Sequence, residues 1–239
     1  MGTMLFGLNI DTLSSNSALD RALELLVEQK VSQVVTINPE MIEYANKNSY
    51  FKDIINESEL VIPDGIGVKI ALKINGINTD RIPGIDFARK LLEESAQKNI
   101  PVAIIGAKDE ILTKAITNLS SEIENLNIVY SHDGYFSNDE EIYADLLAKS
   151  PKLVLVAMGS PRQEEFIYNA KKVLKTGLMI GIGGSLDVWS GCVKRAPKFF
   201  QKLGLEWFYR TVSQPSRLKR IFPTLPVFIL KSIKYRIFK

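Results

Sequence analysis

Cysteine and histidine are almost absent from this chain, which holds one of each in 239 residues. The lone Cys192 excludes a disulfide scaffold, and with the lone His132 it cannot build a conventional structural zinc site. A reducing, cytoplasmic setting is therefore expected. The first eleven residues carry no basic segment followed by a long apolar run, so no signal peptide is predicted.

Three common ligand motifs are also missing. Gly65-Ile66-Gly67 begins like a dinucleotide fingerprint, but Ile70 stands at the third glycine position. The chain has no GxxxxGK[ST] loop, and it has no Asp-x-Asp pair of the kind that holds a divalent ion on a sugar-nucleotide diphosphate. These absences disfavour a Rossmann-type oxidoreductase, and we predict neither a metal nor a cofactor.

Acidic residues are nearly absent from one part of the chain. Residues 1–193 hold 18 Lys and Arg against 26 Asp and Glu, a net charge of −8, whereas residues 194–239 hold 12 against one, Glu206, a net charge of +11. The overall composition, with 46% hydrophobic residues, is that of a globular protein. We predict an α/β core over residues 1–193 and a basic helical appendage over residues 194–239.

The appendage also contains an apolar run, Ile221–Leu230, followed by Lys231, Lys234 and Arg236. Two prolines interrupt this run, which is much shorter than the roughly 20 residues that span a bilayer. Basic charge with aromatic residues is typical of segments that bind anionic membrane, nucleic acid or a phosphorylated ligand. The apolar content favours the membrane interface, and the alternative is a basic helical cap packed on the core.

Apolar runs suited to strands alternate with amphipathic helical patterns. The predicted strands cover residues 4–10, 33–37, 60–62, 102–105, 128–130, 153–158 and 178–182. The predicted helices cover residues 18–28, 39–46, 67–73, 86–97, 110–119, 140–148 and 161–173. Since the strands are almost continuously apolar, we expect a Rossmann-like open parallel sheet sandwiched by helices.

Ligands of such sheets bind beyond the carboxyl ends of the strands, where this chain is rich in polar residues and glycine. Asp64 follows a buried strand and is a candidate general base, although capping the next helix is its alternative role. Gly183 and Gly184 are candidates either for phosphate contact or for close packing. His132 lacks an obvious nucleophile partner, so a structural role is expected for it.

Several short segments share an order and spacing that are specific when taken together. They are Thr36-Ile37-Asn38-Pro39, Pro63-Asp64-Gly65, Arg81-Ile82-Pro83-Gly84, Gly159-Ser160-Pro161-Arg162-Gln163-Glu164, Gly181-Ile182-Gly183-Gly184, Arg195-Ala196-Pro197 and Gly204-Leu205-Glu206-Trp207. In this respect the sequence resembles the WecG/TagA/CpsF glycosyltransferase family over nearly its whole length.

The resemblance implies an inverting, metal-independent transfer of N-acetylmannosamine from UDP-N-acetylmannosamine to undecaprenyl-diphosphate-linked N-acetylglucosamine. The product would carry a β1,4 linkage and belong to the linkage unit of wall teichoic acid. The resemblance assigns Asp64 as the catalytic base. It places four further residues in the substrate pocket: Thr36, Asn38, Arg81 and Gln163. It also implies that at least one of Arg210, Arg217 and Arg220 contacts the diphosphate.

The resemblance further implies how the appendage works. Oligomers would leave it displaced, and a membrane-bound monomer would close it over the pocket. The expected partners are a UDP-sugar donor, a polyprenyl-diphosphate-linked acceptor, the anionic inner face of the plasma membrane and a second copy of the chain, without nucleic acid. Two alternatives stay open: a transferase that uses N-acetylmannosaminuronic acid or glucose, and a peripheral membrane-binding module without catalysis.

Overall fold

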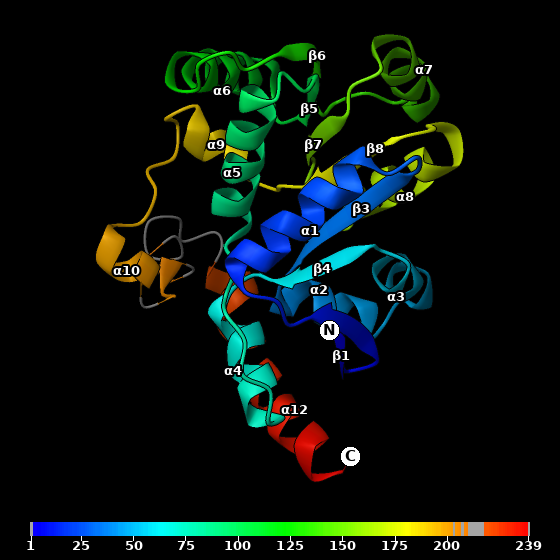
Figure 1. Ribbon diagram of the computed structural model, residues 1–239. Helices are drawn as coiled ribbons and strands as arrows, with labels where there is room; N and C mark the ends of the chain where they lie inside the picture. The colour runs from blue at the N-terminus through cyan, green and yellow to red at the C-terminus, as the bar shows by residue number, and fades with distance from the viewer. Residues whose placement is uncertain (1, 203, 207, 210–217, 239) are drawn as a thin grey trace.

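A six-stranded parallel sheet forms the centre of the molecule (Figure 1). The computed structural model describes residues 2–202, 204–206, 208–209 and 218–238, with the backbone alone at 202 and 218–224. The strands run in the spatial order β4-β3-β8-β7-β5-β6, and every neighbouring pair is parallel. They are β3 (Val31–Ile37), β4 (Leu60–Pro63), β5 (Val102–Gly106), β6 (Ile128–His132), β7 (Leu153–Ala157) and β8 (Gly177–Gly181).

Helices cover both faces of this sheet, which confirms the predicted open α/β sandwich (Figure 1). One face packs against α1 (Ser15–Val27), α5 (Gly84–Gln97), α6 (Asp109–Glu122) and α9 (Ser185–Trp189). The other face packs against α2 (Pro39–Ala45), α3 (Ser49–Asn56), α4 (Ile66–Ile74), α7 (Asp139–Lys149) and α8 (Arg162–Val173). Every residue of β5, β7 and β8 is buried, as their continuous apolar sequences predict.

The first apolar run differs from the prediction. Residues 4–10 do not form one strand: β1 (Gly2–Leu5) and β2 (Leu8–Asp11) pair as an antiparallel hairpin that is separate from the main sheet. Phe6 and Gly7, at φ 53° and 74°, form the two-residue turn between them. Such a turn matches the right-handed twist of the two strands. Helix α3 was not expected from the sequence.

The C-terminal helix α12 (Leu218–Ile237) packs along α4 and also contacts α2. Its Phe228 is fully buried in the same hydrophobic cluster as residues of α2 and α4. Phe6 of the hairpin turn contacts the rings of Phe228 and Tyr235, with centroids 5.6 and 4.7 Å away. The helix pair α4 and α12 forms the lower end of the molecule in Figure 1. The boundary at residues 193 and 194 stays a prediction, but α12 shares its core with the preceding residues.

Candidate active site

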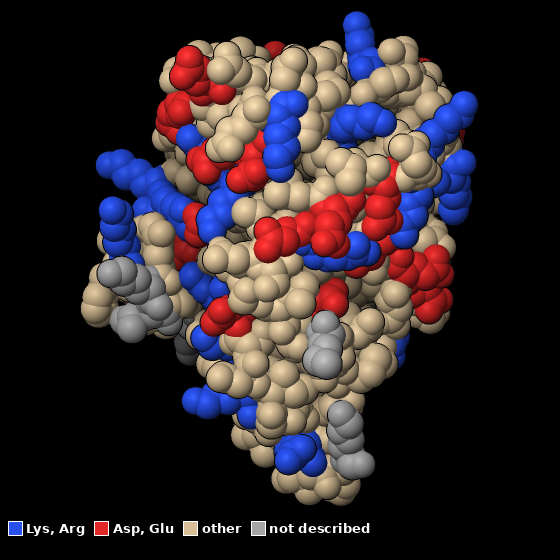
Figure 2. All heavy atoms as spheres, viewed as in Figure 1, with Lys and Arg blue, Asp and Glu red and all other residues tan. Residues whose placement is uncertain are grey.

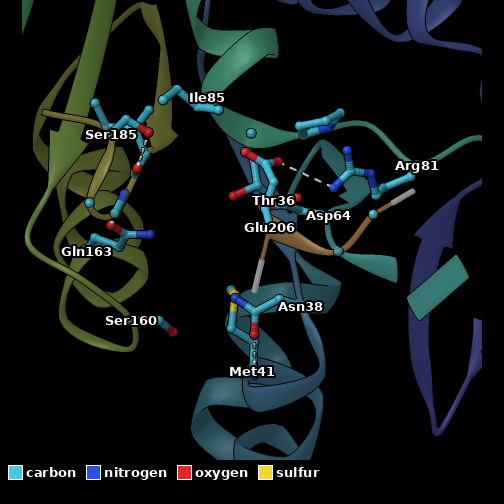
Figure 3. Close-up of a pocket in the computed structure, with 17 residues that line it drawn as sticks. Thr36, Asn38, Met41, Asp64, Arg81, Ile85, Ser160, Gln163, Ser185 and Glu206 are labelled. Atoms are coloured by element: carbon cyan, nitrogen blue, oxygen red, sulfur yellow. Dashed lines mark hydrogen bonds and ion pairs between the residues drawn. The ribbon is translucent and has the colours of Figure 1, made fainter. Parts of the chain in front are cut away.

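A cavity of about 290 Å³ opens at the carboxyl ends of β3, β4 and β8 (Figure 3). All seven site residues expected within residues 1–193 line it: Thr36, Asn38, Asp64, Arg81, Gln163, Gly183 and Gly184. They come from segments up to 148 positions apart in the sequence and meet because the strands of a parallel sheet end at one edge. The other side chains of the wall were not selected as site residues: Met41, Pro83, Ile85, Ser160, Ile182, Ser185 and Glu206.

Asp64 stands at the end of β4, where its backbone N–H donates to the carbonyl of Ile37 at 2.8 Å. The next residue, Gly65, has φ 83° and is the N-cap of α4, but no side chain caps that helix. The alternative role of Asp64 as a helix cap of α4 is therefore wrong. The carboxylate faces the cavity and accepts hydrogen bonds from the backbone of Gly65 and Gly84.

The pKa of Asp64 is raised from 3.8 to about 6, and burial is the main cause. The positive charge of Arg81 and the two backbone hydrogen bonds oppose this rise, whereas the negative charge of Glu206 adds to it. A carboxylate with such a pKa is ionised at neutral pH and binds a proton more readily than an exposed aspartate. Both properties are required of a general base.

Thr36 lies near the end of β3, and Asn38 directly follows that strand. Each side chain makes one hydrogen bond within the protein and keeps a polar group for a substrate. The Thr36 hydroxyl donates to the carbonyl of Gly181 at 3.3 Å, which leaves its oxygen able to accept. Asn38 caps α2 because its Oδ1 accepts from the backbone of Met41 at 3.1 Å. Its amide NH₂ group is therefore the part that can donate to a substrate in the cavity.

Gln163, near the start of α8, joins two loops of the cavity wall. Its Oε1 accepts from the backbone N–H of Gly159 at 3.2 Å and of Gly183 at 3.0 Å. Its Nε2 donates to Glu164 at 2.7 Å. Only one N–H of Gln163 is left for a substrate, so its larger contribution is to the shape of the wall.

Arg81 connects the cavity to the C-terminal segment. Its Nη2 donates to the carbonyl of Gln201 at 2.9 Å, and its Nη1 lies 3.5 Å from Oε2 of Glu206 (Figure 3). Glu206 also accepts from Arg195 at 3.2 Å, and Arg195 makes two hydrogen bonds of 2.6 Å to Asp86. The basic segment thus contributes an acid, Glu206, to the cavity wall.

Three arginines expected at the diphosphate cannot be placed. Arg210 and Arg217 lie outside the described residues, and at Arg220 only the backbone of α12 is described. The expected phosphate contact by the appendage arginines therefore stays a prediction. His132 Nδ1 donates a 2.9 Å hydrogen bond to the carbonyl of Asp133, and His132 does not line the cavity.

Within the described part of the chain, no group of three or more His, Cys, Asp and Glu side chains is arranged to bind a metal ion. The charged side chains that line the cavity are Asp64, Arg81 and Glu206. No described helix is both long and apolar enough to cross a bilayer.

The fold is a Rossmann-like α/β sandwich, and its cavity holds a partly buried acid, Asp64, at the strand ends. The family model of the WecG/TagA/CpsF glycosyl transferases matches residues 3–239, so the chain belongs to that family and is a glycosyltransferase. It is similar to the N-acetylglucosaminyldiphosphoundecaprenol N-acetyl-beta-D-mannosaminyltransferase of Bacillus subtilis strain 168. The two are 35% identical over 230 residues, which cover 95% of this chain and 90% of that relative.

Proposed function

We propose that this glycosyltransferase moves N-acetylmannosamine from UDP-N-acetylmannosamine to undecaprenyl-diphosphate-linked N-acetylglucosamine, with inversion and a β1,4 linkage. The name of the Bacillus subtilis relative and the extent of the match support the acceptor and the transferred sugar. The UDP carrier and the β1,4 linkage are what the family resemblance implies. The observation that carries the chemistry is the Asp64 carboxylate, which faces the cavity with a pKa of about 6. The lipid-linked disaccharide formed would belong to the linkage unit of wall teichoic acid.

In the proposed reaction, Asp64 accepts the proton of the acceptor sugar hydroxyl as that oxygen attacks the anomeric carbon of the donor. The new C–O bond forms on one face of the sugar while the bond to the diphosphate oxygen breaks on the other face. Inversion follows, and UDP leaves with the electron pair of the broken bond. Hydrogen bonds from Gly65 and Gly84 hold the carboxylate in place during this step.

The leaving diphosphate develops negative charge that has to be stabilised. We propose that cationic side chains do this without a metal, because the sequence lacks an Asp-x-Asp pair. Arg81 lies in the cavity wall, and Arg210, Arg217 and Arg220 are the further candidates. The N-terminus of α4 adds backbone N–H donors, because this helix begins at the cavity and no side chain caps it.

The charges in the cavity favour an uncharged donor sugar over a uronic acid. Asp64 and Glu206 are acidic, and the one cation among the described lining residues, Arg81, is already paired with Glu206. A carboxylated sugar would meet two negative charges at this wall. This observation ranks N-acetylmannosaminuronic acid below N-acetylmannosamine, whereas it does not separate N-acetylmannosamine from glucose.

We also propose peripheral contact with the inner face of the plasma membrane through α12. Its outward residues include Leu230, Ile233 and Ile237, which are 67%, 43% and 70% exposed, with Lys231 and Lys234 between them. In Figure 2 the lower end of the molecule, where α4 and α12 lie, is tan and blue. Apolar side chains flanked by basic ones are suited to an anionic bilayer interface. Association into a homo-oligomer that displaces the appendage remains part of this proposal.

The direct test is incubation of the purified full-length chain with UDP-N-acetylmannosamine and a lipid-diphosphate N-acetylglucosamine analogue, with EDTA present. Release of UDP, together with a β1,4-linked disaccharide identified by NMR, is expected. UDP-glucose and UDP-N-acetylmannosaminuronic acid serve as competing donors. Dependence on an added divalent ion, or faster transfer from either competing donor, would contradict the corresponding part of the proposal.

A further inference from the structure

Glu164 is a buried acid directly behind the cavity wall. It is 2% exposed, on α8, next to Gln163. Burying a carboxyl group costs free energy unless its oxygens gain partners. One oxygen, Oε1, accepts from Gln163 Nε2 at 2.7 Å, whereas Oε2 has no hydrogen-bond partner among the described residues. Burial raises the pKa of this group to about 7, although hydrogen bonds with the side chains of Gln163 and Ser160 oppose the rise.

The contact with Glu164 fixes, together with the N–H groups of Gly159 and Gly183, which way the Gln163 amide points. The two ends of an amide have almost the same shape, so hydrogen-bond partners decide its orientation. The carboxyl oxygen of Glu164 accepts from the NH₂ end, and the carbonyl end of Gln163 then faces the N–H groups of Gly159 and Gly183. A flipped amide would place its NH₂ end against these two N–H donors.

Gly159 and Gly183 lie in turns that the hydrogen bonds to the Gln163 amide connect. Gly159 follows β7 and Gly183 follows β8, with φ values of 78° and 48°, and a Cβ at either position would have no atom within 4 Å. Local backbone hydrogen bonds hold each turn separately, from Gln163 N–H to the Gly159 carbonyl and from Ser185 N–H to the Ile182 carbonyl. The shared acceptor on Gln163 is the group that links the two turns to each other. Gly183, with Gly184 and Ser160 beside the two turns, lines the cavity.

We infer that Glu164 is a positioning residue of the donor pocket, which orients the Gln163 amide so that the loops after β7 and β8 keep the shape that binds the donor nucleoside diphosphate. The inference rests on the proposed function for its ligand only. The effect on the two loops follows from the hydrogen bonds and can be measured without any substrate.

The test compares Glu164→Gln with Glu164→Leu in the full-length chain. Glutamine keeps an acceptor for Gln163, whereas leucine fills the same space without one. Amide hydrogen exchange is followed in peptides that contain Gly159 and Gly183, and binding of UDP is followed by calorimetry. Glu164→Leu should lose at least about tenfold in protection of both loops and in UDP affinity, with β5 and β7 unchanged. Glu164→Gln should stay within about twofold of the original chain.

Glu165→Gln is the matched control, since it removes a neighbouring charge on α8 without touching Gln163, and it should change neither readout. Glu164→Ala is run in parallel so that a folding failure of one variant does not remove the comparison. In a Gln163→Leu background, Glu164→Leu should produce no further loss of protection. Normal protection of both loops in Glu164→Leu, or equal losses in Glu164→Gln and Glu164→Leu, would overturn the inference. A chain that binds no UDP but shows the expected exchange pattern would instead reject the proposed function.

Discussion

Arg81 and Glu206 form an ion pair across the wall of the cavity, with Nη1 and Oε2 3.5 Å apart and both side chains largely buried. Glu206 is the only acid among residues 194–239, and Arg81 belongs to the preceding part of the chain. The two charges act on the pKa of Asp64 in opposite directions. The position of the C-terminal segment, which carries Glu206, therefore affects the pKa of Asp64, the proposed base.

Changes at this ion pair should move the pH dependence of transfer. Since Asp64 acts as a base when ionised, kcat/KM should rise with pH around an apparent pKa of about 6. Glu206→Gln removes a charge that raises the Asp64 pKa, so the acidic limb should move to lower pH. Arg81→Gln removes a charge that lowers it, so the limb should move to higher pH. Rates measured from about pH 5 to about pH 8 test this. A shift of the acidic limb of the pH–rate profile in the same direction in both variants would contradict this prediction.

Asp64→Asn should stabilise the fold at neutral pH while removing activity. The folded-state pKa is raised above the unfolded value of 3.8, so ionisation of Asp64 opposes folding increasingly as the pH rises from about 4 to about 6. The effect is complete above about pH 6 and absent well below pH 4. The gain in unfolding free energy should be about 1 kcal/mol at pH 7.5, allowing for solvent screening at the cavity. Denaturant unfolding at pH 7.5 and pH 4 measures it, with Asp20→Asn as an exposed control. An equal gain at both pH values would contradict the assigned cause.

Gly181→Ala should disturb the cavity through Gln163. A Cβ at Gly181 would lie 2.4 Å from Gln163 Nε2 and 3.0 Å from Glu164 Oε1, so the amide has to move. We expect UDP affinity to fall at least about tenfold through loss of the hydrogen bonds to Gly159 and Gly183. Calorimetry measures the affinity. Binding equal to that of the original chain would show that the wall tolerates a displaced Gln163.

Membrane binding should depend on the outward face of α12. Leu230→Glu and Ile237→Glu each place a negative charge on this face and should strongly reduce flotation with phosphatidylglycerol vesicles. Val27→Glu is the matched control, because Val27 is 71% exposed on α1, in a different part of the molecule. If all three variants float as well as the original chain, α12 does not contact the bilayer.

Most of the sheet and of the cavity could be predicted from the sequence. Continuous apolar runs predicted the six parallel strands, and polar residues after those runs, such as Asp64 and Thr36, meet at one edge of the sheet. The hairpin escaped prediction because its turn needs a positive φ at Phe6, which a phenylalanine rarely adopts. The roles of Glu206 and Glu164 depend on contacts between distant segments, with Arg81 and within the cavity wall, which no local pattern reveals.

Asp64 illustrates the difference between local and tertiary information. An aspartate close to the start of a predicted helix is a candidate cap, and local propensity favoured that role. The structure instead directs its carboxylate toward Gly84 at the start of α5, where the absence of a Cβ also allows Thr36 to approach within 3.0 Å of the position a Cβ would take. Only the packing of β4 beside β3 and α5 determines this orientation.

The most direct test of Asp64 as the base is the single-turnover rate of Asp64→Asn with the donor already bound. Asparagine keeps the shape and one acceptor oxygen for the backbone N–H groups of Gly65 and Gly84, but it cannot take the proton. Transfer should slow by about 10²- to 10⁴-fold at pH 7.5 while UDP affinity stays within a few-fold and Asp20→Asn remains fully active. Transfer by Asp64→Asn at close to the original rate would contradict the account.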